Sequence, residues 1–296
     1  MRQARIAAAA ASVALLAGLT ACGGGSDSAG GGGSDKDNLS PAQAVLAELK
    51  QASKNTDEQD SAKVESEQTQ STPQGEMSTK SEGALDWSGG GTTAEMTVTQ
   101  QGSAAQKLPT SGKPMPARYT EDAMYLNMGD EFASTAGKGK HWLQYDYDKL
   151  AEQAGPSGAL IKDQMQNNNP ARSVELLLAS GKVKKIGTET VKGKKTDHYR
   201  GTLKVSELAR MQSKKLTEKE LDQLADQLKQ QGFKTETVDL WIDGDDLLVK
   251  KQETAKGANG DLDSTAYYTD YGTEVTVEAP AASDTMSFED VLGSGS

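Results

Sequence analysis

Two hydrophobic periodicities divide the chain into predicted helices and strands. Apolar residues recur every three to four positions in residues 41–53, which predicts a helix, and Ser40 and Pro41 suit its N-cap and its first helical position. In other segments apolar and polar residues alternate, as they do around Ala62 and Val64. Such alternation predicts strands that are buried on one face and solvated on the other.

The alternating segments predict an antiparallel sheet. Turn residues separate them, notably the three glycines at 89–91, Lys192-Gly193 and Gly244-Asp245. The closing pattern, with a turn at Tyr271-Gly272, predicts a last hairpin. The predicted strands lie at residues 62–65, 94–99, 124–128, 199–205, 238–243, 247–254, 262–270 and 274–278.

Further helices are predicted between these strands. Thr217 and Glu220 form a capping box before an apolar stripe that ends ahead of Gly232. Leu176, Leu177 and Leu178 form the most apolar triplet after the leader; packing on the sheet is the favoured interpretation, with a ligand contact as the alternative. The predicted helices lie at residues 147–154, 160–165, 171–180, where Asn169 and Pro170 supply the cap, and 217–228. The whole is an α+β fold: an antiparallel sheet with helices on one face.

The N-terminus has the layout of an export signal. Arg2 and Arg5 precede an apolar run at residues 6–19, which is too short for a permanent transmembrane helix. Small residues then lead into Cys22, as in the lipobox of bacterial lipoproteins, where the cysteine is acylated and the signal is removed before it. We therefore expect residues 1–21 to be a lipoprotein signal peptide and Cys22 to anchor the protein to the extracytoplasmic face of the cell membrane.

The same features divide the rest of the chain. The Gly- and Ser-rich residues 22–38 are expected to be a flexible tether, residues 39–281 a folded domain and residues 282–296 a C-terminal tail. Removal of the signal, which holds two arginines and no acidic residue, would leave 30 basic and 43 acidic residues, a net charge of −13. Cys22 is the only cysteine, so no disulfide can form within one chain.

Composition then excludes several classes of protein. Leu, Ile, Val and Phe together make up about 16% of the 296 residues, so a large hydrophobic enzyme core is not expected. No uncharged apolar run is long enough for a polytopic membrane protein. The acidic charge disfavours nucleic-acid binding, which needs a basic surface.

The candidate chemical motifs are weak. His141 and His198 lie 57 residues apart, and both are predicted to be polar surface or edge residues. Asp243, Asp245 and Asp246 lack the spacing of a calcium loop and are interpreted as an acidic turn. The glycine-lysine segment at 187–196 does not match a phosphate-binding loop. We therefore expect no catalytic site, no metal site and no cofactor.

Three segments carry a resemblance to a known family. They are residues 193–202 (GKKTDHYRGT), 238–244 (VDLWIDG) and 267–280 (YYTDYGTEVTVEAP), and they accompany the lipobox and the Gly-rich tether. Together they resemble the LppX/LprAFG lipoproteins, relatives of the LolA/LolB carriers. The resemblance implies a strongly curved antiparallel sheet, an incomplete barrel, with helices on its concave face and a cavity that accepts a lipid or glycolipid.

The predicted cavity lining comes from the apolar faces of these elements. The alternative is a filled core, in which case the protein would be an interaction or sensory lipoprotein whose protein partner the sequence does not identify. The candidate lining residues are Met124, Leu126, Met128, Trp142, Leu143, Leu177, Leu178, Leu203, Val205, Leu240 and Ile242.

Overall fold

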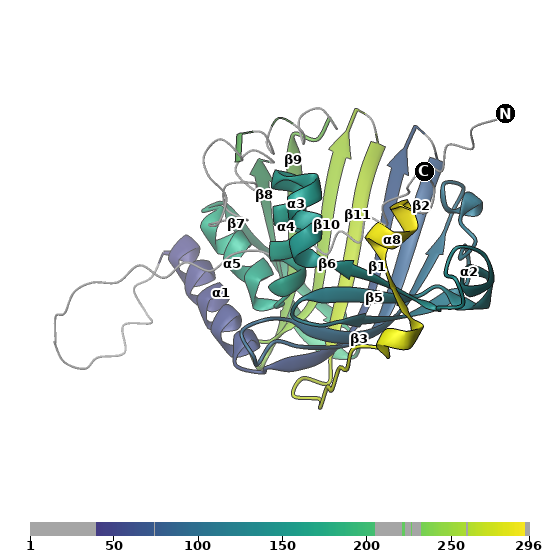
Figure 1. The fold of residues 1–296 in the computed structure, drawn as a ribbon. Helices are drawn as coiled ribbons and strands as arrows, with labels where there is room; N and C mark the ends of the chain where they lie inside the picture. Colours follow the sequence, from purple (N-terminus) through teal and green to yellow (C-terminus); the bar gives the residue numbers. More distant parts are fainter. Residues whose placement is uncertain are drawn as a thin grey trace.

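The fold is a single curved sheet wrapped around helices (Figure 1). In the described part of the chain, twelve strands follow the order β12-β6-β5-β4-β3-β2-β1-β11-β10-β9-β8-β7. Neighbours are antiparallel, except that β12 runs parallel to β6. The ends of this order, β12 and β7, do not pair, so the predicted incomplete barrel is confirmed. The computed structural model describes residues 40–73, 75–204, 221–222, 226, 232–258 and 260–293.

The strands agree with the alternating pattern over most of the chain. Four further strands, β2, β4, β6 and β7, pair with strands that the pattern predicted. The strands are β1 (Ser61–Thr72), β2 (Gly75–Asp86), β3 (Thr93–Gln101), β4 (Pro114–Tyr119), β5 (Ala123–Asn127), β6 (Trp142–Asp146), β7 (Val183–Val191), β8 (Lys194–Lys204), β9 (Thr235–Asp243), β10 (Leu248–Gly257), β11 (Gly260–Thr269) and β12 (Thr285–Ser287).

Two helices begin next to residues that the sequence predicted as caps, whereas α4 begins four residues before its predicted start and α2 was not predicted. Ser40 accepts a hydrogen bond from the Gln43 backbone while the Gln43 side chain bonds back to Ser40, a complete capping box. Asn169 caps α5, because its Oδ1 accepts from the Ala171 N–H at 2.9 Å. The described helices are α1 (Pro41–Asp57), α2 (Gly129–Thr135), α3 (Tyr147–Ala154), α4 (Pro156–Gln166), α5 (Ala171–Ala179) and α8 (Phe288–Gly293), with 3-10 turns η2 (Ala105–Lys107) and η3 (Ala282–Asp284).

The predicted helix at 217–228 lies mostly outside the described residues. Of its positions, Leu221, Asp222 and Asp226 are described, and all three are helical. Within the described ranges, no helix combines the length and the apolar character that crossing a membrane requires.

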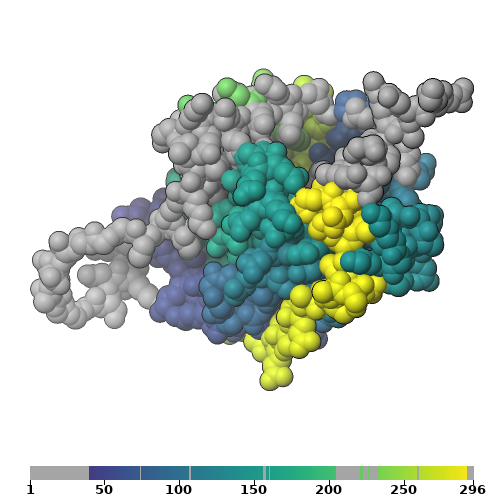
Figure 2. Space-filling model, viewed as in Figure 1, coloured from purple at the N-terminus to yellow at the C-terminus, as the bar shows by residue number. Residues whose placement is uncertain are grey.

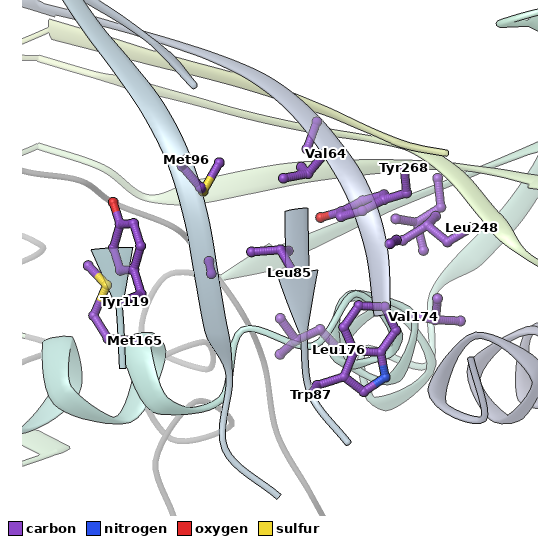
Figure 3. Close-up of a cluster of buried hydrophobic side chains, with 14 of the residues drawn as sticks. Val64, Leu85, Trp87, Met96, Tyr119, Met165, Val174, Leu176, Leu248 and Tyr268 are labelled. Atoms are coloured by element: carbon purple, nitrogen blue, oxygen red, sulfur yellow. The ribbon is translucent and has the colours of Figure 1, made fainter. Parts of the chain in front are cut away.

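One hydrophobic core fills the space between the concave face of the sheet and helices α1 and α5. Leu49 of α1 and Leu177 of α5 are fully buried against strand residues such as Leu240. Figure 3 shows Val174 and Leu176 of α5 beside Trp87, and Met165 of α4 next to Tyr119. Strands from both ends of the sheet order contribute, so this core holds the curved sheet together.

A glycine lets α5 approach the sheet closely. Gly201 of β8 faces Leu177, and a Cβ atom built at Gly201 would lie 2.5 Å from Leu177 Cδ1. Real Cβ atoms do not approach other atoms so closely. The absence of a side chain at this position therefore sets how deeply the helix packs.

The C-terminal residues depart from the sequence prediction. The predicted strand at 274–278 is wrong: these residues pair with no strand and instead cross the outer face of the sheet, where Arg118 Nη1 donates to the Glu278 carbonyl at 3.1 Å. Residues 282–293, predicted as a tail, contain β12 and α8. The prediction failed because alternating apolar and polar residues fit any extended segment, whether or not it pairs with another strand.

Side chains fasten this C-terminal segment to the sheet. Asp284 Oδ1 accepts hydrogen bonds from the His141 backbone N–H at 2.9 Å and from His141 Nδ1 at 2.7 Å. The bond to Asp284 raises the pKa of His141. Phe288 of α8 stacks on Tyr145 of β6. Figure 2 shows the C-terminal residues, in yellow, lying against the teal part of the surface.

We predict that Gly201→Ala destabilises the fold by about 1–3 kcal/mol, because the new methyl group must displace the buried Leu177. Urea unfolding followed by circular dichroism measures the change. Gly187→Ala is the matched control in the neighbouring strand β7, since a Cβ there meets nothing within 4 Å. Equal stability of the two variants would contradict the close approach of α5.

Candidate ligand-binding face

The concave face of the sheet is the candidate site that the sequence predicted, and its apolar part is packed. At 0% exposure, Leu177 and Leu240 have no surface left for a ligand in this conformation. The other predicted lining residues in the buried core are Met124, Leu126, Leu203 and Ile242. Leu143 is also buried.

Three predicted lining residues lie elsewhere, and a fourth is not among the described residues. Met128 and Leu178 are partly buried at the margin of the core. Trp142 lies on the outer face, because it alternates with the core residue Leu143, and the Arg118 guanidinium lies 5.1 Å from its ring centre. Val205 lies outside the described residues. Trp142 therefore does not belong to the candidate face. The strand register, and not the hydrophobicity of the residue, determines which face it occupies.

Further along the same face the side chains become polar. Glu236 of β9 and Lys251 and Glu253 of β10 are 6%, 5% and 1% exposed, respectively. Lys251 Nζ lies 3.2 Å from Glu253 Oε2. Their strand partners, such as Leu240 opposite Lys251, belong to the core face. We call Glu236, Lys251 and Glu253 the buried ionisable trio.

A β-bulge turns two members of this trio inward. The register of β10 against β9 shifts between Leu248 and Lys250, so Lys250 pairs with the outer residue Trp241 and Lys251 with the core residue Leu240. Strict alternation from Leu248 would have placed Lys251 on the outer face. One extra residue in a strand reverses the facing of every later side chain. Lys251 and Glu253 were therefore missed from sequence, where bulges leave no reliable signal.

Burial dominates the electrostatics of the trio. It raises the pKa of Glu236 to about 8, with a further increase from the nearby Glu253. Burial alone would lower the pKa of Lys251, but Glu253, Tyr268 and Glu236 together outweigh burial, so the pKa rises. At neutral pH the trio therefore consists of a charged Lys251 beside Glu253 and a mostly protonated Glu236.

His141 is partly exposed next to β6, as predicted, but His198 differs from its predicted setting. His198 is 4% exposed, so its prediction as a surface residue is wrong. On the outer face it stacks on Trp241, with 4.3 Å between ring centres, and its ring nitrogens contact Glu189 and Asp239. Lys250 Nζ lies 4.0 Å from the centre of the Trp241 ring. His198 and Lys250 cover Trp241 on the outer face, so β9 is buried on both faces. The long lysine side chain can do this because it lies along the aromatic ring.

In the acidic turn, Asp243 has a structural role. Asp243 Oδ1 accepts hydrogen bonds from the backbone N–H groups of Asp245 and Leu247, both at 3.0 Å, and Lys194 Nζ lies 2.6 Å from Asp243 Oδ2. Asp243 therefore closes the β9–β10 turn. Among the described residues, no group of histidine, cysteine and carboxylate side chains has the arrangement of a metal site.

We predict that Glu236→Gln stabilises the protein increasingly with pH. An unfolded glutamate ionises near pH 4.5, whereas the folded Glu236 stays protonated to about pH 8, so the wild-type fold loses stability across this window. Glutamine does not titrate. In urea unfolding, the advantage of the variant should grow by about 3 kcal/mol between pH 5 and 8. Exposed Glu67→Gln is the control; parallel pH profiles for both variants would contradict the assignment.

Comparison with solved structures returned two mycobacterial proteins. The lipoprotein LppX of Mycobacterium tuberculosis has 17% identity and a TM-score of 0.48, with 79% of this chain and 98% of LppX covered. LprF of Mycobacterium bovis has 17% identity and a TM-score of 0.46, with 82% and 100% covered. Both names are those of the family that the sequence motifs resemble. Nothing about a ligand follows from a likeness this distant.

Comparison with known protein sequences returned relatives of higher identity, although no family model matches the chain. A 31.2 kDa protein from the rplA-rplJ region of Streptomyces griseus is 44% identical over 254 residues, which cover 84% of this chain and 81% of the relative. A Streptomyces coelicolor protein named "Putative lipoprotein" is 38% identical over 223 residues, which cover 74% and 67%. The chain therefore belongs to the family that contains these two streptomycete proteins.

Proposed function

We propose that this protein is a membrane-anchored, extracytoplasmic lipoprotein that binds an amphiphile at the concave face of its sheet. It binds rather than catalyses, and it can pass the amphiphile between the membrane and an acceptor across the cell envelope. The observation that carries the proposal is the division of that face: a packed apolar part lies next to the buried ionisable trio.

The anchor is supported by the sequence and by one relative. Cys22 follows an export signal with small residues before it, and the Streptomyces coelicolor relative carries a lipoprotein name. Two or three acyl chains on one residue give stable anchoring, since each buried methylene contributes about 0.8 kcal/mol. The residues of the signal, Cys22 and the tether lie outside the described part of the chain.

The ligand class follows from the chemistry of the face. Burying ionisable groups is costly, so a trio enclosed beside an apolar core favours a functional explanation over a purely structural one. An amphiphile has a part that suits each region: its apolar chain would lie along the core side chains, and its polar group would meet Glu236, Lys251 and Glu253. Removing the chain from water contributes about 25 cal/mol per Å².

Binding requires the packed core to open, and its composition suits this. Met96, Met115, Met124 and Met165 all belong to the core. Methionine has an unbranched, flexible side chain that repacks around irregular shapes more easily than leucine or isoleucine. These residues come from β3, β4, β5 and α4, so the adaptable region lies on the side of the sheet away from α1 and α5.

A second function is favoured by the packing itself. Because Leu177 and Leu240 are fully buried, the same fold could serve with a permanently filled core as an interaction or sensory lipoprotein. In that case the exposed outer face would carry the function. Ligand analysis separates the two functions.

We predict that Cys22→Ala releases the protein from the membrane fraction, because the only thiol available for acylation is lost. Detergent phase partitioning and incorporation of labelled fatty acid measure the loss. Ser26→Ala, in the same tether, should remain membrane-bound and labelled. Retention of label in the Cys22 variant would overturn the anchor.

We predict that residues 23–296, expressed without the acylated cysteine, carry a stoichiometric amphiphile in native mass spectrometry with solvent extraction. The double variant Lys251→Met and Glu253→Met should carry severalfold less, because the polar part of the ligand loses its partners. Apolar side chains of similar volume can replace a buried ion pair without loss of stability.

The matched control is Lys80→Met with Glu67→Met, an exposed ion pair of 3.4 Å on the outer face. It should retain the ligand. A protein that is free of ligand, and stays so after incubation with membrane lipids, would rule out amphiphile binding and favour the interaction function.

A further inference from the structure

The charge of the chain is distributed unevenly over the sheet. Residues 181–204, which include the β7–β8 hairpin, hold eight basic residues and two acidic ones, although the whole chain has a net charge of −11. Both acidic side chains have basic partners: Glu189 contacts His198, and Asp197 pairs with Lys185. The hairpin therefore carries an excess of positive charge at one edge of an acidic protein.

Five basic side chains gather at one end of strands β7, β8 and β9. β7 ends the sheet order, and Lys184 on it lies opposite Arg200 of β8. Lys204 ends β8 beside the start of β9, Lys182 directly precedes β7, and Lys234 directly precedes β9. All five are exposed. We call Lys182, Lys184, Arg200, Lys204 and Lys234 the basic end of the sheet.

Little acidic charge opposes the basic end. Asp239 of β9 pairs with Arg200, whose Nε lies 2.7 Å from Asp239 Oδ1. Glu236, also on β9, belongs to the concave face and is buried. Neither Lys182 nor Lys184 forms an ion pair with another of the described residues. The positive charge of these two lysines therefore remains available at the surface.

Helix α1 begins at the same end of the sheet. Its last turn lies at the opposite end, where Asn55 Nδ2 donates to the Asp245 carbonyl of the β9–β10 turn at 3.2 Å. Its middle lies at the β7–β8 side of the sheet (Figure 1), where the Tyr199 hydroxyl donates to Glu48 Oε2 at 2.6 Å. From Ser40 to Glu48 the helix rises about 12 Å, the length of about four strand residues. The start of α1 is therefore level with the last residues of β8, at the basic end.

The tether limits how far the basic end can lie from the membrane. Cys22, the proposed anchor, precedes Ser40 by 18 residues, and a flexible chain of that length has a root-mean-square reach of roughly 21–25 Å. A folded domain of this size is about 45 Å across. The end at which α1 begins is therefore held nearer the bilayer than the opposite end.

An exposed apolar side chain accompanies the lysines. Ile186 of β7 is 49% exposed, which makes it one of two large apolar side chains that are exposed in the described ranges. The register of β7 against β8 shifts between Lys185 and Gly187, so Ile186 lies in this irregularity. An apolar side chain next to lysines is typical of surfaces that lie in the headgroup region of a bilayer.

The acidic remainder of the protein does not prevent contact with an anionic surface. At physiological ionic strength, exposed charges more than about 8 Å apart are largely screened from each other. Only the side chains at the contact therefore determine the attraction. Lysine and arginine side chains near an anionic bilayer each strengthen it.

We propose that the basic end docks on the surface of a membrane that contains anionic lipids. This inference rests on the proposed anchor, which brings the basic end to the bilayer. Docking also orients the concave face, because Glu236 lies opposite Leu203, one residue before Lys204. The end of the concave face that holds Glu236 of the buried ionisable trio is thereby turned toward the bilayer, the source of an amphiphile.

Vesicle sedimentation of residues 22–296 with Cys22→Ala tests the docking without any contribution from acyl chains. At physiological ionic strength we expect binding to vesicles that contain phosphatidylglycerol and none to vesicles of phosphatidylcholine alone. Salt at about 1 M, where the screening length is about 3 Å, should release the protein. The absence of binding, or equal binding to both kinds of vesicle, would overturn the proposal. Neither result bears on the anchor, which fatty-acid labelling of Cys22 measures separately.

Lys182→Gln with Lys184→Gln should weaken vesicle binding about tenfold to thirtyfold, because two charges are lost at the contact. Lys80→Gln with Lys113→Gln is the matched control, since it removes two exposed lysines elsewhere and changes the net charge equally. The control should bind as the parent protein does. Equal weakening in both double variants would show that only the net charge matters and would contradict docking through the basic end.

Two further arms test the kind of contact. Ile186→Ser should weaken vesicle binding severalfold, whereas Ile161→Ser, at the other exposed apolar side chain, should leave it unchanged. Equal effects of the two substitutions would contradict insertion at β7. Displacement of the protein from vesicles by millimolar glycerol 3-phosphate would indicate a pocket for a single phosphate group and would overturn docking on a lipid surface.

Discussion

Packing of α1 and α5 against the concave face is the interaction on which the rest of the structure depends. The sheet is open, so hydrogen bonds between strands do not join its two ends, β12 and β7. The hydrophobic core contacts strands from both halves and therefore fixes the curvature. Since Leu, Ile, Val and Phe are scarce, most of the large apolar side chains described belong to this single core.

The scarcity of apolar residues also shapes the remainder of the concave face. Where the core ends, Glu236, Lys251 and Glu253 occupy inward positions, so one face carries both an apolar and an ionisable region. A single bulge in β10 produces this arrangement by exchanging the facing of Lys251 and Lys250. The exchange changes both faces of the sheet: Lys251 lies on the concave face, and Lys250 lies over Trp241 on the outer face.

The outer face is stabilised by a different kind of contact. Stacking of His198 on Trp241, lysine–aromatic contacts and ion pairs cover it, with little apolar area. The C-terminal segment crosses this face before β12 adds to the edge at β6. An edge that is paired in this way is protected from pairing with other chains.

The sequence by itself determined the local elements. Capping residues such as Ser40 and Asn169 specify helix starts through hydrogen bonds to neighbouring residues, and alternation identifies strands such as β3 and β9, because both signals are local. The order of these elements and the closing motifs carried the resemblance to the LppX/LprAFG lipoproteins, and that resemblance implied the curved open sheet.

Only the tertiary structure decided which faces meet. It placed Trp142 on the outer face, buried His198 on that same face, left residues 274–278 unpaired, added β12 to the sheet and turned Lys251 and Glu253 inward. Each of these outcomes depends on strand register, a bulge or a contact between residues far apart in the chain. Such features are set by long-range packing, so hydrophobic periodicity in the sequence does not predict them.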